Sequence, residues 1–284
     1  MSHLNLLLVS ICSIIAQCQA IPDELSERLF EASTPNIFED ITVNLQGRTN
    51  QYLTDDNAPK PLFTHVNNTV LSKVPTIVRI RELFKKYDRT QFLIDRTPND
   101  FVKENNFLNK IIDTPVMQIA MNFLHKEGII QSMDAKDQRQ LLKTIWFKNF
   151  PRERNVMFAS CGFKHVFMKE IVKKNEITGL HNWIYYYDQE RDSQNELDYK
   201  GYFKSISLGN KAQILKYRVR YKDVPKPVNT MFIGTLPEFE MALYTVCHQL
   251  KKLFCDVSLA GQKFRITILR HYKEQTIISA FPDF

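Results

Sequence analysis

Apolar residues recur at helical spacing through the first half of the chain. Between residues 76 and 87 they stand three or four positions apart, at Ile77, Ile80, Leu83 and Phe84. That spacing places them along one face of a helix. A similar pattern behind Asp23 predicts a helix over residues 24–31, and another helix is predicted over residues 134–146.

The segment of residues 54–61 differs from these helices because it is polar and contains Pro59 and Pro61. Proline lacks a backbone N–H and fixes its own φ, so the segment is predicted to be a loop. From residue 23 to about residue 128 the pattern is otherwise helical. We therefore predict a helical lobe over about residues 21–150.

β-Branched and aromatic residues dominate the chain after Pro151. Short runs of them predict strands over residues 156–158, 163–167, 213–221, 230–233, 264–269 and 276–281. Helical patterns interrupt these strands at residues 181–190 and 237–253. Because strands and helices do not alternate regularly, we predict an α+β fold with two mostly antiparallel sheets. This β-rich lobe, about residues 151–284, is expected to hold a catalytic cleft between the sheets.

The first twenty residues form a pattern of their own. They contain no Lys, Arg, Asp or Glu, are apolar from Leu6 to Ala16, and end in Cys18-Gln19-Ala20. We predict a removable secretion signal over residues 1–20 and a secreted mature protein that begins near Ile21. A retained membrane anchor is the alternative, because the signal lacks a positively charged start. No later segment is apolar enough to span a bilayer.

Cysteines and a sequon add to this picture of the compartment. Cys161, Cys247 and Cys255 follow the signal, and Cys247 could pair with Cys255 in an oxidising compartment, leaving Cys161 free. Asn67-Asn68-Thr69 is a glycosylation sequon, so Asn67 is a candidate modification site. CxxC and HExxH spacings are absent from the sequence, which disfavours a structural zinc site. We expect a monomer.

Charge favours an anionic partner. The chain has 38 basic and 31 acidic residues and a formal net charge of +7. None of these charges lies in the predicted signal, so the whole excess belongs to the mature protein. Such a protein favours nucleic acid, glycosaminoglycan or anionic lipid.

Two of the seven histidines stand where the chain changes from one element to the next. His165 follows a glycine turn, and His181 follows another and opens the predicted helix. A helix start can lower the proton affinity of a histidine. Lys226 lies between two prolines, which restrict the backbone and fix the origin of its side chain.

Five segments, dense from about residue 160 onward, carry a specific set of motifs. They read CGFKHVFMKE, GLHNWIYYYDQE, LDYKGYF, KPVNTMFIGTLPEFEMALYT and IISAFP. As a set, and in this order, they resemble the signatures of the EndoU family of poly(U)-specific endoribonucleases. The resemblance implies an α+β fold with a helical lobe beside two β-sheets. It also implies a substrate of single-stranded RNA that contains uridine.

The resemblance assigns catalytic roles to His165, His181 and Lys226. RNA cleavage of this kind uses the ribose 2′-oxygen, which must lose a proton while the departing 5′-oxygen gains one. Histidine suits both tasks near neutral pH. The family implies His181 as the base and His165 as the acid, although the sequence alone also allows the exchanged roles. Lys226 would stabilise charge on the phosphoryl oxygens, and the product would be a 2′,3′-cyclic phosphate.

Base recognition is implied for three further residues. Thr230 is the hydroxyl residue four positions after the lysine. Phe281 takes the place of a C-terminal aromatic residue on which uracil would stack, and Ser279 lies beside it. The family usually has Thr and Tyr where this chain has Ser279 and Phe281, so these residues are expected to tune binding differently.

A second departure precedes the first histidine. The family commonly has Glu where this chain has Lys164, and that Glu is tied to catalysis and to dependence on divalent ions. The resemblance therefore implies Mn²⁺ as a cofactor, while Lys164 leaves the dependence open and the metal ligands unknown. We expect Lys164 to weaken activation by manganese and to tighten phosphate binding. Glu170, five residues after His165, is retained as a supporting residue.

One strand is predicted to be basic on one face. Its charged residues Lys216, Arg218, Arg220 and Lys222 alternate with Leu215, Tyr217, Val219 and Tyr221. The basic face is either a solvated surface or, given its closeness to Lys226 in sequence, a surface along which RNA lies.

Two other functions compete with the nuclease. A secreted RNA- or polyanion-binding protein that keeps the fold but has weakened turnover is motivated by Lys164 and the altered C-terminal residues. Binding of RNA without a cyclic-phosphate product would identify it. A peptide or ester hydrolase is disfavoured, because the chain has no GxSxG motif and Ser160-Cys161-Gly162 has no placed acid.

Overall fold

The computed structural model describes residues 21–50, 56–87, 98–151, 160–172, 176–271, 273 and 275–284. The predicted signal over residues 1–20 and the predicted strand over residues 156–158 lie outside these residues. Among the residues described, no helix is long and apolar enough to cross a membrane.

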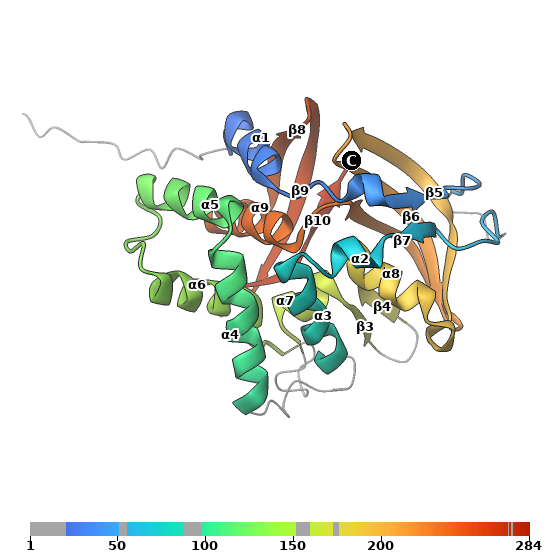
Figure 1. The fold of residues 1–284 in the computed structure, drawn as a ribbon, viewed down its shortest axis with the longest axis horizontal. Coiled ribbons are helices and arrows are strands. Elements are labelled where there is room, and N and C mark those ends of the chain that lie inside the picture. The colour runs from blue at the N-terminus through green and yellow to red at the C-terminus, as the bar shows by residue number, and fades with distance from the viewer. Residues whose placement is uncertain are drawn as a thin grey trace, which may run out of the picture.

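The described part of the first half of the chain forms six α-helices, the later of which lie together at the left of the molecule in Figure 1. They are α1 (Asp23–Ala32), α2 (Asn68–Leu71), α3 (Pro75–Tyr87), α4 (Pro98–Ile112), α5 (Pro115–Lys126) and α6 (Ala135–Phe147). The apolar positions predicted to face the core of α3 are all buried. The helices predicted over residues 24–31, 76–87 and 134–146 are thereby confirmed.

A short antiparallel pair of strands, β1 (Ile41–Val43) and β2 (Phe63–Val66), interrupts this half. The purely helical interpretation of residues 23–128 is wrong here. Part of the reason lies far away in sequence: the carboxylate of Glu190 accepts hydrogen bonds from the backbone N–H groups of Leu62 and Phe63, at 2.7 and 3.0 Å. A local pattern of apolar residues does not indicate a hydrogen-bond partner that lies so far away in sequence.

The second half contains two three-stranded antiparallel sheets and a two-stranded hairpin. One sheet has the order β5 (Leu197–Leu208), β6 (Ala212–Tyr221), β7 (Val224–Ile233), and the other has the order β10 (Thr276–Asp283), β9 (Gln262–His271), β8 (Phe254–Leu259). The hairpin pairs β3 (Lys169–Val172) with β4 (Glu176–Gly179). The predicted α+β class with antiparallel sheets is confirmed.

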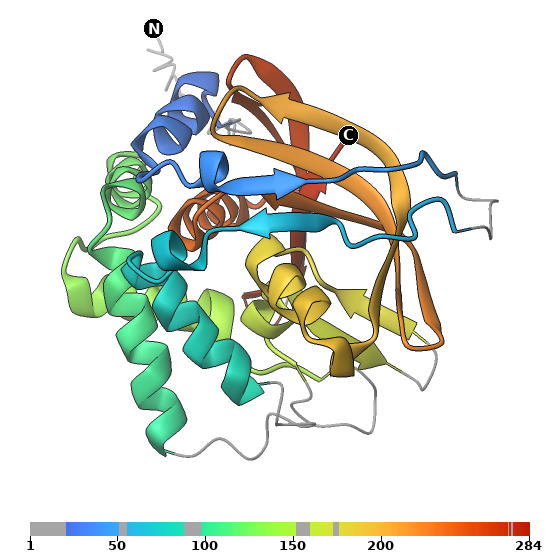
Figure 2. The same ribbon diagram turned by 45° about the vertical axis from the view of Figure 1, so that its right-hand side comes forward.

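The sheet β5–β7 curves along one side of the molecule, and the end of β10 comes up beside it (Figure 2). Helix α9 (Pro237–Gln249) packs near the other sheet, and α8 (Trp183–Arg191) lies against the concave side of β5–β7. Both helices were placed by their sequence patterns, but α8 begins two residues later than predicted. Helix α9 ends at Gln249 rather than at residue 253.

Residues 163–167 form a helix, not the predicted strand. They belong to α7 (Gly162–Phe167), in which every residue is buried. The Phe163 ring lies 5.0 to 6.2 Å, centre to centre, from the rings of Phe84, Tyr87, Phe107, Phe147 and Phe167. Aromatic enrichment at this position therefore reflects burial among helices rather than a pleated sheet.

We predict that Phe163→Ala lowers the free energy of unfolding by about 3–5 kcal/mol, because it removes a fully buried ring and leaves a cavity. Urea denaturation of the purified protein measures this change. The matched control is Phe101→Ala, since Phe101 is 42% exposed on α4. Its effect should stay within about 0.5 kcal/mol. Equal losses in the two variants would contradict the central place given to Phe163.

Candidate active site

Three segments of the chain meet at Gly179, the last residue of β4. A Cβ atom added to Gly179 would lie 2.1 Å from the carbonyl oxygen of His165 and 2.5 Å from that of Met168. The Gly179 carbonyl also accepts a hydrogen bond from the ammonium group of Lys226. With φ at +74°, the position suits glycine on conformational grounds as well. Glycine here allows the two histidine-bearing segments and the lysine to lie together.

Leu180, the residue after Gly179, has a left-handed backbone conformation, with φ at +65°. A leucine rarely adopts this conformation, so its surroundings must enforce it. Its N–H donates to Met168 O at 2.7 Å, and its carbonyl accepts from Asn229 Nδ2 at 2.6 Å and from Tyr217 Oη at 3.2 Å. These contacts fix the direction in which the chain enters His181.

His181 is buried and held by both its backbone and its ring. Its N–H donates to Val166 O at 3.0 Å, and its Nδ1 lies 2.8 Å from the backbone carbonyl oxygen of Thr230. Because a carbonyl can only accept, Nδ1 must carry the hydrogen, and Nε2 keeps its lone pair in the neutral ring. The ring stacks on Phe281 at 4.7 Å between centres.

The pKa of His181 is well below its ordinary value. Burial is the larger cause, and the positive charge of Lys226 adds to it, while the hydrogen bond to Thr230 acts in the opposite direction. A helix start is not among these causes of the lowered pKa, and α8 begins only at Trp183, two residues after His181. The predicted lowering of the proton affinity of His181 is confirmed, but its cause is burial and the charge of Lys226. At neutral pH the His181 ring is therefore uncharged.

His165 has a different environment. Its Nδ1 lies 2.9 Å from Oε2 of Glu170, and the other carboxylate oxygen accepts from Ser160 Oγ at 2.5 Å. An ionised carboxylate accepts the Nδ1 hydrogen and leaves Nε2 for another partner. Glu170 thus acts as the orienting group for His165, and Ser160 holds Glu170 rather than serving as a nucleophile.

Lys226 lies on β7, between Pro225 and Pro227. Strand β7 is at the edge of its sheet, where proline costs no ladder hydrogen bond. The ammonium group reaches the Gly179 carbonyl, and its charge acts on His181. The two prolines thus flank Lys226 on β7, the strand that positions this lysine next to the histidine-bearing segments.

The residues implied in base recognition lie on two strands around His181. Thr230 is on β7, and its buried hydroxyl has no hydrogen-bond partner among the residues described. Phe281 and Ser279 are on β10, with Ser279 buried two positions before the ring that stacks on His181. A buried hydroxyl without a partner is uncommon and calls for an explanation, such as a ligand.

Other predicted residues have structural partners. Asn67 caps α2 by accepting from Val70 N at 3.3 Å, and its amide donates to Asp40 Oδ1 at 2.9 Å. Cys247 and Cys255 form a disulfide, while Cys161 is buried and is not disulfide-bonded. Lys164 is buried on α7, next to His165 in sequence.

The donors near the histidines do not make up a metal site. Within the described ranges, no group of three or more His, Cys, Asp or Glu side chains is placed to hold a metal ion. Glu170 is already engaged by His165 and Ser160. Lys164 lies at the position for which the family resemblance implies a carboxylate. The donor groups of the residues described therefore do not fit Mn²⁺.

Two buried imidazoles that differ in their partners, next to a fixed cation, define a site for acid–base chemistry on an anionic group such as a phosphodiester. Comparison with known proteins gives the class. The family model described as "Endoribonuclease XendoU" matches residues 22–282. The chain belongs to this family of endoribonucleases, as its motifs indicate.

Named relatives agree with this family. The chain is 36% identical over 235 residues to "Uridylate-specific endoribonuclease EndoU" of Drosophila melanogaster, covering 80% of this chain and 70% of that protein. It is 33% identical over 250 residues to "Poly(U)-specific endoribonuclease-B" of Xenopus laevis, covering 82% and 83%. A solved structure, described as "XendoU: a splicing independent snoRNA processing endoribonuclease", matches with a TM-score of 0.78 and 31% identity, over 92% of this chain and 95% of the other.

The sequence alone missed several supporting residues. Ser160 was considered only as a nucleophile, and Asn229 lies within a family motif without a role of its own. Their partners, Glu170 and Leu180, are 10 and 49 positions away. Gly179 was recognised as a turn, but its close approach to His165 depends on the fold. The one signal in the sequence is that Asn229 is a polar residue in a run of apolar strand positions.

We predict that Lys226→Met raises the pKa of His181, because the variant removes a positive charge that disfavours the protonated ring. Burial remains, so the pKa stays below its ordinary value. Any activity that needs the neutral ring would then decline at a higher pH as the solution is acidified. An NMR titration of the histidine side chains measures the change. Lys263→Met, which removes an exposed lysine paired with Asp23, is the control; a His181 pKa that is equal in the two variants would contradict the account.

Proposed function

We propose that this protein is a uridylate-specific endoribonuclease that cuts single-stranded RNA by attack of the ribose 2′-oxygen on the adjacent phosphorus. The observation that carries the proposal is the pairing of a buried, uncharged His181 beside Lys226 with a carboxylate-bound His165. The names of the relatives, which specify uridylate or poly(U), support the choice of substrate.

The two histidines divide the proton transfers between them. Nε2 of His181 takes the proton of the 2′-hydroxyl as the 2′-oxygen bonds to phosphorus. The bond from phosphorus to the 5′-oxygen breaks, and Nε2 of His165 gives that oxygen a proton. Glu170 supports this role because a neighbouring carboxylate favours the protonated imidazole. The products are a 2′,3′-cyclic phosphate and a free 5′-hydroxyl, so protons and bonds balance.

Lys226 supplies the fixed positive charge of the reaction. Negative charge grows on the non-bridging phosphoryl oxygens as the 2′-oxygen attacks, and a cation already in place stabilises it without reorganisation. The hydrogen bond to Gly179 O holds the ammonium group near the histidines. In this proposal Lys226 has a second effect, because its charge adds to burial in lowering the pKa of His181.

Uracil is proposed to bind between β7 and β10. The unpartnered hydroxyl of Thr230 can donate to or accept from the polar edge of the base, and Phe281 offers a ring for stacking. Ser279 lies close by on β10. A pyrimidine fits this arrangement through one hydrogen-bonding group and one flat apolar surface.

We also propose that the protein is secreted and acts as a monomer. The apolar, uncharged residues 1–20 support secretion, and the Cys247–Cys255 disulfide suits an oxidising compartment. Expression in a secretory cell line, followed by intact-mass measurement of the medium protein before and after glycosidase treatment, tests cleavage near Ile21 and a glycan on Asn67. Protein that stays inside the cell with residues 1–20 attached would contradict the proposal.

We predict that the mature protein cuts a fluorescent oligonucleotide with one uridine among adenosines, on the 3′ side of the uridine, and leaves a cyclic phosphate. His181→Ala and His165→Ala should each reduce kcat by about 10²- to 10⁴-fold, because each removes one proton transfer. Mass spectrometry of the fragments identifies the ends. Reactions in EDTA and in manganese should both proceed, since the donors described do not form a metal site.

Two outcomes would overturn parts of this proposal. RNA that binds tightly but stays intact would favour the binding protein without turnover. Cleavage that vanishes in EDTA and returns with manganese would show that a metal acts in the reaction despite Lys164.

A further inference from the structure

One face of sheet β5–β7 places two lysines in line with the proposed uracil contact. Cross-strand pairs on this sheet are Thr230 with Lys216 and Lys216 with Lys204. Directly opposite residues of antiparallel strands share a face, so the three side chains form a row from β7 across β6 to β5. With strands about 4.8 Å apart, the row extends about 10 Å from Thr230 to Lys204. We call Lys216 and Lys204 the lysine row.

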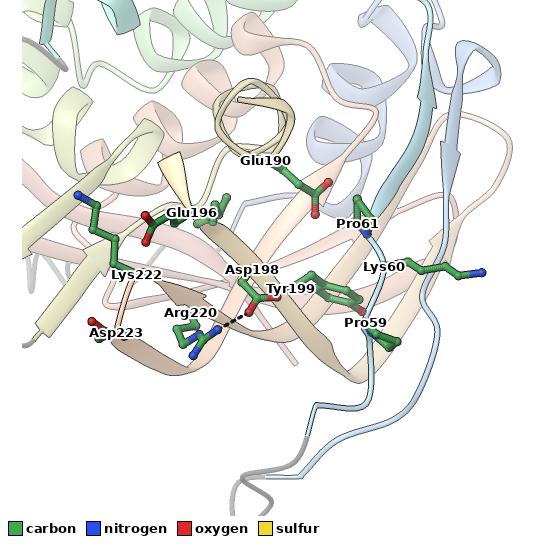
Figure 3. Close-up of a pocket in the computed structure, with 11 residues that line it drawn as sticks. Pro59, Lys60, Pro61, Glu190, Glu196, Asp198, Tyr199, Arg220, Lys222 and Asp223 are labelled. Atoms are coloured by element: carbon green, nitrogen blue, oxygen red, sulfur yellow. Dashed lines mark hydrogen bonds and ion pairs between the residues drawn. The ribbon is translucent and has the colours of Figure 1, made fainter. Parts of the chain in front are cut away.

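The lysine row differs in its charge balance from the far end of the same sheet. There Arg220 pairs with Asp198 at 2.9 Å, at a cavity of about 390 Å³ shown in Figure 3. Lys200 pairs with both Asp198 and Asp56. In contrast, Lys204 forms no ion pair with any residue described, and Lys216 contacts an oxygen of Phe284, the last residue of the chain given. Lys204 thus keeps uncompensated charge at the end of the lysine row, and Lys216 adds a second positive charge between it and Thr230.

An aromatic residue borders the lysine row. The Lys204 ammonium lies 5.2 Å from the centre of the Phe284 ring, and Lys216 Nζ donates to Phe284 O at 3.4 Å. Lys204 is exposed and Lys216 is half-buried, so both can be reached from solvent. Cations next to a ring are the usual composition of a surface that follows single-stranded nucleic acid, with phosphates on the lysines and a base on the ring.

We infer that the lysine row binds the phosphates of the nucleotides on the 5′ side of the cleaved uridine. This inference rests on the proposed function, which places the scissile phosphate at the histidines and Lys226 and the uracil at Thr230. The nucleotides that continue from the 5′-oxygen of that uridine lie on the uracil side of the scissile phosphate. Beyond Thr230 on that side stand Lys216 and then Lys204.

The contact is electrostatic and independent of base identity. The site would therefore read uridine at one position and accept any base at the positions before it. Substrates with nucleotides 5′ of the uridine should bind more tightly than substrates that begin with it. The advantage should decline with salt, because each phosphate contact releases counterions.

The test compares two oligonucleotides of equal length, each with one 2′-deoxyuridine that blocks cleavage. One carries its adenosines almost entirely on the 5′ side and the other on the 3′ side. Fluorescence anisotropy gives Kd for the wild type and for the double variant Lys204→Ala/Lys216→Ala. The control variant, Lys126→Ala/Lys136→Ala, removes the same charge from exposed positions on α5 and α6.

We predict that the double variant weakens binding of the 5′-extended oligonucleotide about tenfold, and of the 3′-extended one less than about twofold. The slope of log Kd against log salt for the 5′-extended oligonucleotide should fall by about 1.4, or about 0.7 for each lost contact. Unchanged binding, or equal weakening of both oligonucleotides, would overturn the inference. A loss as large in the control variant would also overturn it, because net charge alone would then explain the effect.

Parallel cleavage of the ribonucleotide forms by wild-type protein separates this inference from the proposed function. If the wild type does not cleave them, the proposed function fails, while the binding data still decide whether the lysine row contacts RNA. If the wild type cleaves both and the double variant binds both as the wild type does, the lysine row fails and the proposed function stands.

Discussion

The close approach of backbone at Gly179 is the constraint on which the site depends. The His165 carbonyl occupies the space that any side chain at this position would need, and the Gly179 carbonyl receives Lys226. The left-handed Leu180 then turns the chain into His181. His165, His181 and Lys226 are thereby brought together by contacts to the main chain around Gly179. Side-chain packing around them, including Phe163 in α7, holds this arrangement from outside.

Burial and hydrogen-bond partners give two identical side chains different tasks. His181 is buried, and its ring lies near a backbone carbonyl and a cation. Burial and the cation disfavour the charged form of the ring, whereas the hydrogen bond to the carbonyl favours it. His165 faces a carboxylate that Ser160 also holds. In the proposed reaction, the uncharged ring accepts a proton and the carboxylate-bound ring donates one. The family resemblance implies the same assignment.

Local patterns predicted those parts of the molecule that local physics decides. The buried face of α3 and the alternation along β6 follow directly from spacing, and the motifs located His165, His181 and Lys226. The helix α7 was mistaken for a strand because its aromatic residues reflect tertiary burial. The pair β1–β2 is supported by hydrogen bonds to Glu190, more than a hundred positions away. The roles of Ser160 and Asn229 likewise depend on partners that no local pattern specifies. Long-range contacts thus account for the parts of the fold and of the site that local sequence patterns did not predict.

The central claim is that close backbone packing at Gly179 sets the catalytic geometry, and single-turnover cleavage by Gly179→Ala tests it most directly. Gly261→Ala is the matched control, because Gly261 has nearly the same φ, +73°, but nothing within 4 Å of an added Cβ. The account predicts that folded Gly179→Ala loses about 10²-fold or more in rate, since a displacement of about 1 Å has that cost. Gly261→Ala should keep nearly the wild-type rate. A folded Gly179→Ala protein that cleaves as fast as Gly261→Ala would contradict the claim.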